Sequence, residues 1–495
     1  MSVIEVPVLI AGGGTCGLAA SNFLLDYNID HLLVERHTST AHVPKAHYLN
    51  QRTMEIFRQH GLAKMVTGQA APVEKLGKIR WQTSLAGSRP LDARLIHQMD
   101  AYGGGSLRER YAADSPMLPS NLSQMRLEPL LRVNAERRAL GRLRLGHELV
   151  EFTDEGDRIT ALIADRETGE RHTVHTKYLI GADGGKTVGP ALGVQLEGPT
   201  GLAGVATLHF SADLSAWTND DTLIIWLINP NYEDLLRATL IPMGPTWGRD
   251  SEEWALHLSF APNDPVRFDE ATAVSKIREV LGLPELELQL YHVSYWMLEA
   301  VLADRYRVGR VFLAGDAVHR HPPATGIGMN TAIQDVHNLA WKLAAVLHGH
   351  AGDGLLDTYE SERRPIGRRN VDWATSASLH HQVITEAALG LGSHLPAHMR
   401  VPMFHAYFDE SAMGETIRAR AAEIFRTNRA ESEAHDIEIG FAYQQGALVP
   451  DGTEPPPRSP MGDVYYPTTR PGHRLPHAWL TLIIRLDRWL VWDGR

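Results

Sequence analysis

Three glycines near the N-terminus have the spacing that a dinucleotide phosphate requires. The stretch VPVLIAGGGTCGLAASNFLLDYNIDHLLVER predicts a buried strand over 6–11, a glycine turn, a helix, and a second strand that ends at Glu35. Gly12 permits a tight turn, Gly14 lets a pyrophosphate approach the backbone, and Gly17 lets the helix pack closely on the strand. The free N–H groups at the helix start would face the anion, and the carboxylate of Glu35 would accept hydrogen bonds from ribose hydroxyls. The sequence therefore predicts a dinucleotide-binding unit.

Two later segments have the same form, an apolar strand that runs into glycine and aspartate. KYLIGADGGKTV, residues 177–188, delivers Asp183, and RVFLAGDAVH, residues 310–319, delivers Gly315 and Asp316. Ligands of open α/β sheets gather where the carboxyl ends of strands meet helix N-termini. We therefore expect the three strand ends to face one extended ligand.

Composition excludes several classes of function. A length of 495 residues predicts two or three domains. A formal charge of −11 gives no basic surface for nucleic acid. The sequence has neither an 18-residue apolar run nor a secretory signal, so we expect no membrane partner and a cytoplasmic protein. The single cysteine, Cys16, cannot form an intrachain disulfide and is interpreted as a small residue that fits the helix start, so redox chemistry would need a bound cofactor.

Taken together, these signatures resemble the class A FAD-dependent monooxygenases, the aromatic hydroxylases related to para-hydroxybenzoate hydroxylase. KAHYLNQRTMEIFRQHG, NLSQMRLEPLL and TYESERRPIG are most similar to the branch of phenol hydroxylases typified by 2,4-dichlorophenol 6-monooxygenase, and the similarity extends to about residue 478. The resemblance implies FAD as cofactor and NAD(P)H as reductant. It also implies that O₂ hydroxylates a small phenolic substrate through a flavin C4a-hydroperoxide.

The resemblance assigns roles to single residues as well. Glu35 would hold the adenosine ribose with Arg36 beside it, and Asp183 would lie by the pyrophosphate. Asp316 would bind the ribityl chain, and Gln124 would touch the flavin side of FAD. The expected cofactor-binding positions are Gly12, Gly14, Thr15, Cys16, Gly17, Glu35, Arg36, Lys45, Gln124, Asp183, Gly315, Asp316, Gly326, Gly328, Met329 and Asn330.

The loop GDAVHRHPPATGIGMNTAIQD, residues 315–335, precedes an amphipathic helix that Gly349 can end. Gly326 and Gly328 let backbone N–H groups approach a ligand, and a helix start stabilises the negative charge of reduced flavin. Pro322 matches the family position beside the ring face where oxygen reacts. His319 and His321 form a His-x-His pair without a further ligand at metal spacing, so no metal is expected.

Between residues 190 and 300 the apolar period changes to alternation, which predicts an antiparallel substrate sheet. In EEWALHLSF, large apolar residues alternate with Ala255, His257 and Ser259. The candidate substrate contacts are Trp226, Asn229, Tyr232, Tyr291 and Tyr295. The acceptor of the phenol proton stays open between His47, which lies in a loop that neighbours the flavin in the family, His292 and Tyr291.

The expected fold class is α/β (α+β multidomain), with a Rossmann-like FAD-binding domain, an inserted antiparallel-sheet substrate domain and a truncated or incomplete thioredoxin-like C-terminal segment. The expected units are 1–189 and 301–450 for FAD, 190–300 for substrate, and 451–495 for a proline-rich linker and the thioredoxin-like remnant. The oligomeric state stays open, with a homodimer among the alternatives.

Three other functions stay open at this point. A flavin-dependent halogenase or another FAD oxidoreductase would share the fold, but the WxWxIP signature of halogenases is absent. An NAD-dependent dehydrogenase without flavin would leave the Asp183 and Asp316 segments unexplained.

Overall fold

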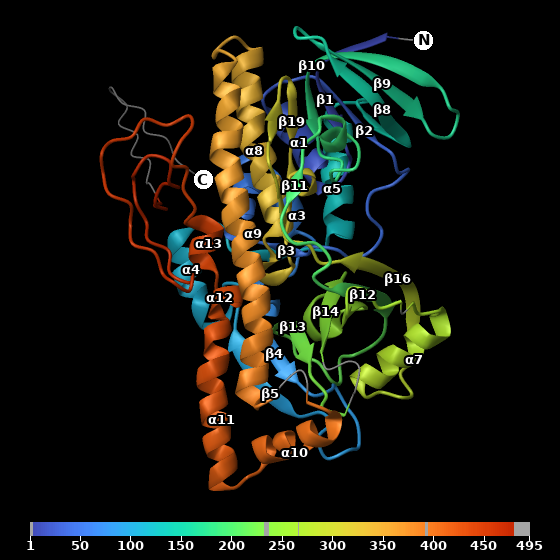
Figure 1. Ribbon diagram of the computed structural model, residues 1–495, viewed down its shortest axis with the longest axis vertical. Helices are drawn as coiled ribbons and strands as arrows, with labels where there is room; N and C mark the ends of the chain where they lie inside the picture. The colour runs from blue at the N-terminus through green and yellow to red at the C-terminus, as the bar shows by residue number, and fades with distance from the viewer. Residues whose placement is uncertain (1–2, 232–236, 266, 392–394, 480–495) are drawn as a thin grey trace, which may run out of the picture.

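The computed structural model describes residues 3–231, 237–265, 267–391 and 395–479, which form two large sheets and two small ones, flanked by long helices (Figure 1). The larger sheet has eight strands, and its central order is β18-β19-β10-β1-β2-β7. Its parallel members are β1 (Val3–Ala11), β2 (His31–Glu35), β7 (Leu143–Leu145), β10 (Arg171–Gly181) and β19 (Val311–Leu313). Three antiparallel strands complete it, namely β18 (Arg307–Val308), β8 (His147–Asp154) and β9 (Ile159–Asp165).

Strand β1 is the centre of this sheet and is buried on both faces. Val8, Leu9 and Ile10 are fully buried, as a strand between helix layers must be. The helices packed around the larger sheet are α1 (Thr15–Asp26), α5 (Gln124–Arg138), α8 (Gly328–Leu347) and α9 (Gly354–Leu389). Because β1, β2, β10 and β19 are parallel, their carboxyl ends lie at one edge. The predicted Rossmann-like arrangement of the three signatures is confirmed.

The second sheet has seven strands in the order β16-β12-β15-β14-β13-β4-β5 and lies below the first in Figure 1. Its strands are β12 (Gly204–Ser211), β13 (Thr222–Leu227), β14 (Ala238–Gly244), β15 (Glu253–Phe260), β16 (Gln289–Met297), β4 (Lys78–Gln82) and β5 (Leu95–Asp100). The predicted substrate sheet is therefore present, but β4 and β5 enter it from the stretch 1–189 that the sequence assigned wholly to FAD. The boundary at residue 190 misses them because β4 pairs with β13 in parallel, far along the chain.

Helix α7 (Glu270–Leu281) covers one face of this seven-stranded sheet. Ala273 and Ile277 on the helix are fully buried in one apolar cluster with Leu256 and Leu258 of β15. The side chain of Asp269 caps the helix start by accepting from Thr272 N–H. The alternating partners in β15 must therefore point to the opposite face.

The remaining helices and strands are short or follow α9. They are α2 (Gln51–Gln59), α3 (Ala63–Thr67), α4 (Arg108–Asp114), α6 (Val188–Ala191), α10 (Ala397–Phe408), α11 (Ala412–Phe425), α12 (Arg429–Ser432), α13 (His435–Ile439), β3 (Tyr48–Leu49), β6 (Ser120–Asn121), β11 (Leu196–Glu197), β17 (Val301–Ala303) and β20 (His319–Arg320). None of the described helices is long and apolar enough to cross a membrane.

Residues 440–479 form an extended segment on the surface of the molecule, without a helix or a named strand. The guanidinium of Arg474 fastens this segment to α2, with Nε 2.9 Å from Oε1 of Glu55. The predicted proline-rich linker at 451–460 is thus extended chain. The expected thioredoxin-like remnant has no helix or sheet in residues 461–479, and residues 480–495 lie outside the described part.

Candidate active site

The glycine turn after β1 is closely packed at Gly12 and Gly17 and open at Gly14. A Cβ added to Gly12 would lie 2.2 Å from the carbonyl oxygen of Ala182, and one added to Gly17 would lie 1.9 Å from that of Gly12. At Gly14 an added Cβ would meet only a carboxylate oxygen of Glu128 at 3.7 Å. The turn therefore needs glycine for close helix packing, and Gly14 leaves the backbone accessible to a phosphate.

Glu35 stands at the end of β2, where the sequence placed it. Its Oε2 accepts from Gly13 N–H at 2.7 Å, and its Oε1 accepts from His37 N–H at 2.8 Å. The half-buried carboxylate is thereby held beside the glycine turn. Arg36 next to it is exposed. This position suits a ribose hydroxyl of a dinucleotide bound along the turn.

Glu128 of α5 is a buried carboxylate at the start of α1 that sequence reasoning missed. Its Oε1 accepts from the backbone N–H of Thr15 at 2.9 Å and from its hydroxyl at 3.0 Å. The same oxygen accepts from Gln124 Nε2 at 2.6 Å, and Oε2 accepts from Ala41 N–H at 2.8 Å. Glu128 thus joins α1, α5 and the loop after β2. The segment QMRLE contained the signal, an acid one helical turn after Gln124.

Asp183 has a local role in its own loop, and its expected place by the pyrophosphate stays a prediction. Its Oδ1 accepts from Gly185 N–H at 3.0 Å, and its Oδ2 accepts from Thr187 and Val188 N–H at 2.6 and 2.9 Å. The carboxylate therefore shapes its own loop and the start of α6. The loop still lies against the glycine turn, because Ala182 N–H donates to the carbonyl oxygen of Ala11 at 2.8 Å.

Asp316 follows β19 and exposes its carboxylate at the same edge of the sheet. Gly315 before it has φ +63° and packs against the buried Cys16, whose Sγ would lie 3.1 Å from an added Cβ. Burial raises the pKa of the Cys16 thiol, and its Sγ donates to the carbonyl oxygen of Ala332 at 3.6 Å. The side chain of Cys16 is thus a packing element between α1 and α8, as the sequence interpretation held.

The loop before α8 contains two successive residues in the left-handed region, Thr325 and Gly326, both at φ +63°. No side chain caps the first turn of α8, so its N-terminal N–H groups remain available to an acceptor. Pro322 and Met329 are buried, and Gly328 lies near His321 Nδ1, which would be 3.4 Å from an added Cβ. This geometry fits the flavin-binding loop that the sequence predicts.

Asn330 fastens this loop instead of presenting its amide to a ligand. Its Oδ1 accepts from Asn50 N–H at 3.0 Å, and its Nδ2 donates to the carbonyl oxygens of Tyr48 and Gly326 at 2.9 and 2.7 Å. The amide of Asn330 therefore has a structural role in the loop, and the expected place of Asn330 beside the cofactor stays a prediction.

Behind the loop lies a fully buried charge network. His319 Nε2 is 2.7 Å from Oδ2 of Asp335, and Arg363 Nε donates to Oδ1 at 2.8 Å. Gly315 N–H also donates to Oδ2 at 3.2 Å. His319 is thus a hydrogen-bond partner of Asp335 in the core. Among the described residues, no cluster of three or more His, Cys, Asp or Glu could hold a metal ion.

His47 lies where the loop after β2 meets the segment before α5. Leu122 N–H donates to its carbonyl oxygen at 2.8 Å, and Gln124 N–H donates to that of Ala46 at 2.8 Å. The ring Nδ1 is 2.6 Å from Oδ1 of Asn121, a partner that sequence reasoning missed. Burial lowers the pKa of His47, so the ring is neutral at pH 7. Lys45 beside it is exposed.

Most of the side chains predicted to contact substrate lie at different places in and around the seven-stranded sheet. Tyr295 points to the α7 face, where its hydroxyl accepts from Phe268 N–H at 2.5 Å. Tyr291 and His292 are exposed on the edge strand β16, and Asn229 is buried, with its Oδ1 accepting from Asn231. The edge position, the strand face and a local turn decide where these four side chains point, and their contacts with substrate stay predictions.

Trp226 keeps a position on the other face of the seven-stranded sheet, the face turned away from α7. Its ring centroid lies 4.1 Å from that of His381 in α9. Tyr232 lies outside the described residues.

Trp226 belongs to a row of directly paired residues that crosses the sheet on this face. The row is Ser294, Thr207, His257, Thr239, Trp226, Trp81 and His97. The same face carries Ala255 and Ile241, which pack with Met125 at the start of α5, so it faces the FAD-binding unit. Sequence reasoning did not select His257 or Thr207. The sequence signal for this face was the set of residues that alternate with the large apolar ones in EEWALHLSF.

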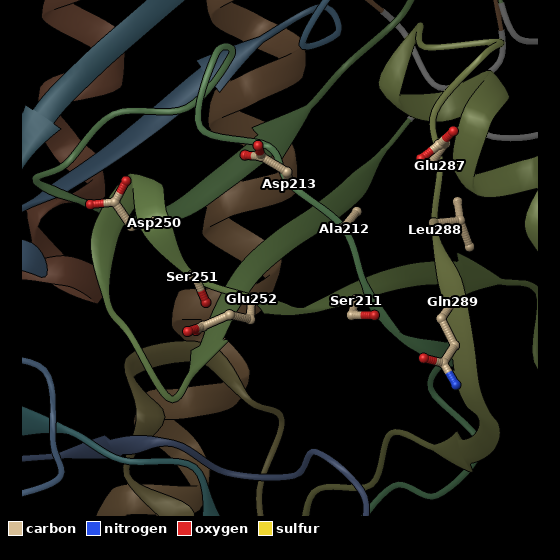
Figure 2. A pocket seen from close by; sticks show the side chains of 9 residues that line it. All are labelled: Ser211, Ala212, Asp213, Asp250, Ser251, Glu252, Glu287, Leu288 and Gln289. Atoms are coloured by element: carbon tan, nitrogen blue, oxygen red, sulfur yellow. The ribbon is translucent and has the colours of Figure 1, made fainter.

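A separate hollow of about 500 Å³ lies at the rim of the same sheet (Figure 2). It is open and acidic, and its lining residues are Ser211, Ala212, Asp213, Asp250, Ser251, Glu252, Glu287, Leu288 and Gln289. None of the three glycine signatures contributes to it. This hollow is therefore separate from the strand ends that carry the glycine signatures.

The donor set at the strand ends fits FAD. The open backbone at Gly14, the carboxylates of Glu35 and Asp316, and the uncapped start of α8 supply a phosphate site, two hydroxyl acceptors and an anion-stabilising helix end along one sheet edge. The chain segments between these groups are mostly buried strands and helices, which hold the groups in fixed positions.

Comparisons with known proteins agree with this geometry. A family model described as an FAD binding domain matches residues 5–374. The chain is 32% identical to 2,4-dichlorophenol 6-monooxygenase of Delftia acidovorans over 97% of its own length and 81% of the relative. It is 34% identical to tetracenomycin A2 monooxygenase-dioxygenase of Streptomyces glaucescens, over 97% of its length and 79% of the relative.

A solved structure extends the likeness to three dimensions. The flavin-dependent monooxygenase PieE, determined in complex with FAD and substrate, is 39% identical, with a TM-score of 0.89 over 96% of this chain and 81% of PieE. The chain therefore belongs to the class A flavoprotein monooxygenases and is an FAD-dependent aromatic hydroxylase.

Proposed function

We propose that the substrate is a phenol whose ring lies between the flavin loop and the flavin-facing row of the seven-stranded sheet, with NAD(P)H and O₂ as co-substrates. FAD supplies hydride acceptance and oxygen activation when bound. The observation that carries the proposal is His47, a neutral ring held by Asn121 at the junction of the FAD-binding unit and the sheet. An NAD(P)H-dependent reaction would place the enzyme in the cytoplasm, where reduced nicotinamide is kept.

The contact with Asn121 decides which nitrogen of His47 can act. With the amide oriented as in the structure, Oδ1 accepts the proton on Nδ1. A neutral ring then has a bare Nε2, which is a hydrogen-bond acceptor. A phenolic hydroxyl within reach would donate to Nε2, and His47 would take the proton as the ring is activated.

The rest of the chain orients the ring and excludes water. The row on the sheet offers Trp226 as a flat apolar surface and Thr239 and His257 as polar contacts, and all three side chains are half-buried. A phenol bound there would have its ring against the sheet and its edge toward the flavin loop. Exclusion of water strengthens each polar contact in the site.

The test begins with the purified protein, which should carry an FAD spectrum. NAD(P)H oxidation is measured with phenol, 2,4-dichlorophenol and tetracenomycin A2, and products are analysed by mass spectrometry under ¹⁸O₂. A phenol that stimulates NAD(P)H oxidation and gains one labelled oxygen atom supports the proposal. Incorporation of oxygen from water, or stimulation only by aromatic compounds without a hydroxyl group, would contradict it.

The assignment of the base has its own comparison. His47→Gln should lower kcat on the order of 10²-fold at full FAD content, as expected for the loss of a general base. His292→Gln, a change at the exposed edge of the sheet, decides between the two histidines among the three sequence candidates. Loss of activity in His292→Gln together with retention in His47→Gln would reverse the assignment.

A further inference from the structure

His257 on β15 faces the FAD-binding unit from the middle of the sheet. Protein encloses it, and burial lowers its pKa to about 4, yet its side chain stays partly exposed. Its side chain therefore keeps some exposed surface on the face of the sheet that is turned toward the FAD-binding unit. Among the described residues, Nε2 of His257 has no hydrogen-bond partner. This nitrogen is not completely buried.

Two neighbours determine the protonation of the His257 ring. Trp296 Nε1, which can only donate, lies 3.0 Å from Oγ1 of Thr207. The same Oγ1 lies 2.8 Å from Nδ1 of His257. Thr207 is buried, and within the described chain its hydroxyl proton has no acceptor other than this Nδ1. The proton of the neutral ring therefore lies on Nε2, which makes Nε2–H a hydrogen-bond donor on the side of the ring away from Thr207.

His47 presents the opposite function. Its Nε2 is an acceptor because the ring proton lies on Nδ1, which donates to Oδ1 of Asn121. The two rings lie close enough that a charge on His47 further lowers the pKa of His257. One ring thus offers a donor from the sheet, and the other offers an acceptor from the loop. A hydroxyl group, which donates one proton and accepts others, is the chemical complement of this pair.

We propose that His257, held by Thr207 and Trp296 with its ring proton on Nε2, donates a hydrogen bond to the oxygen of the bound phenol while His47 accepts the phenol proton. This inference rests on the proposed function, since it names the second group that reads the substrate hydroxyl. Once the proton has moved to His47, the N–H of His257 stabilises the phenolate oxygen. His257 would thus select rings that carry an acceptor oxygen and favour their ionised form.

The probe is 4-nitrophenol, whose absorption reports its ionisation, titrated into the FAD-loaded oxidised enzyme. His257→Leu should weaken its binding on the order of tenfold and raise the pKa of the bound ligand. His257→Gln, whose amide can still donate, should recover part of both effects. Nitrobenzene, which lacks the phenolic oxygen, should bind wild type and His257→Leu equally.

Two further variants separate this role from folding. Thr207→Val removes the hydroxyl that orients the ring and should give a smaller change of the same sign at full FAD content. Ser259→Ala, an exposed position on the same strand and face, should leave the binding of 4-nitrophenol unchanged.

The outcomes distinguish the two proposals. Equal affinity and equal ligand ionisation in wild type and His257→Leu would overturn the inference alone. If the wild-type enzyme binds neither 4-nitrophenol nor any of the phenols used to test the proposed function, both the proposed function and this inference are overturned. An equal loss of nitrobenzene and 4-nitrophenol binding would show a packing role for His257 and would also overturn the inference.

Discussion

The hydroxyl of Tyr48 on β3 donates to Oε1 of Glu438 at 2.8 Å and so joins β3 to helix α13. The ring of Tyr48 also lies against Gly326, where an added Cβ would be 3.0 Å from its Cδ1. Both Tyr48 and Glu438 are buried, and burial raises the pKa of Glu438 to about 8. The acid is therefore protonated at neutral pH, directly behind the loop that receives the flavin.

This raised pKa predicts a pH-dependent stability. The folded value of about 8 lies above the ordinary value of 4.5, so the folded protein binds the extra proton between these pH values. The contribution of Glu438 to stability is complete below the lower value and is lost as pH rises to the upper one. Its share of the slope is at most about 1.4 kcal/mol per pH unit. Urea unfolding from pH 5 to pH 8 should show a flatter dependence for Glu438→Gln than for wild type. Glu285→Gln, at an exposed carboxylate, should keep the wild-type slope, and an unchanged slope in Glu438→Gln would contradict the prediction.

The buried pair of Asp335 and Arg363 predicts a large loss of stability on single substitution. Both side chains have no exposed area. Asp335→Asn should lower the free energy of unfolding by about 3 to 5 kcal/mol, because it leaves a buried guanidinium without its counter-charge. Chemical denaturation of the FAD-free protein measures the loss apart from cofactor binding. The exposed pair of Arg158 and Glu155 is the control, and Glu155→Gln should leave the unfolding midpoint unchanged. Equal effects at both pairs would contradict the prediction.

Two carboxylates at the sheet edge predict weaker FAD binding when removed. Glu35→Ala and Asp316→Ala should each cost about 1.5 to 3 kcal/mol of FAD affinity, because each removes a charged acceptor of a sugar or ribityl hydroxyl. Fluorescence titration of the apoprotein with FAD measures the change. Asp250→Ala, in the acidic hollow of Figure 2, should bind FAD like wild type. A loss at Asp250 with normal binding at both other positions would move the cofactor site to that hollow.

Two glycines with similar backbone angles allow the effect of the flavin loop on FAD to be distinguished from the effect of backbone strain. Gly326 has φ +63° and Gly349 has φ +75°, so alanine should strain the backbone similarly at each, on the order of 1 kcal/mol. An added Cβ at Gly326 meets Tyr48, whereas one at Gly349 has no atom within 4 Å. Gly326→Ala should therefore also weaken FAD binding and slow anaerobic flavin reduction by NAD(P)H in stopped-flow experiments. Gly349→Ala should lower the unfolding midpoint alone, and identical behaviour of the two variants would show that the loop does not contact the flavin.

The FAD-binding unit could be predicted from the sequence because its signals are local. A strand, Gly12, Gly14 and Gly17, a helix and Glu35 occupy one continuous stretch, and each feature follows from a backbone requirement at its own position. The start of α8 after Gly326, which no side chain caps, likewise depends on residues that are close together in the sequence. The model places all of these at one sheet edge, since parallel strands align their carboxyl ends.

The other half of the site depended on tertiary structure. Alternation in β15 revealed two faces, but only the packing of α7 on Leu256 and Leu258 decided that His257 faces the FAD-binding unit. The contact of His257 with Thr207 needs the pairing of β15 with β12, and the buried position of Glu128 at α1 needs α5 to cross from a distant part of the chain. Register and long-range packing are properties of the assembled sheet, so a one-residue change in pairing would turn a different set of side chains toward the substrate.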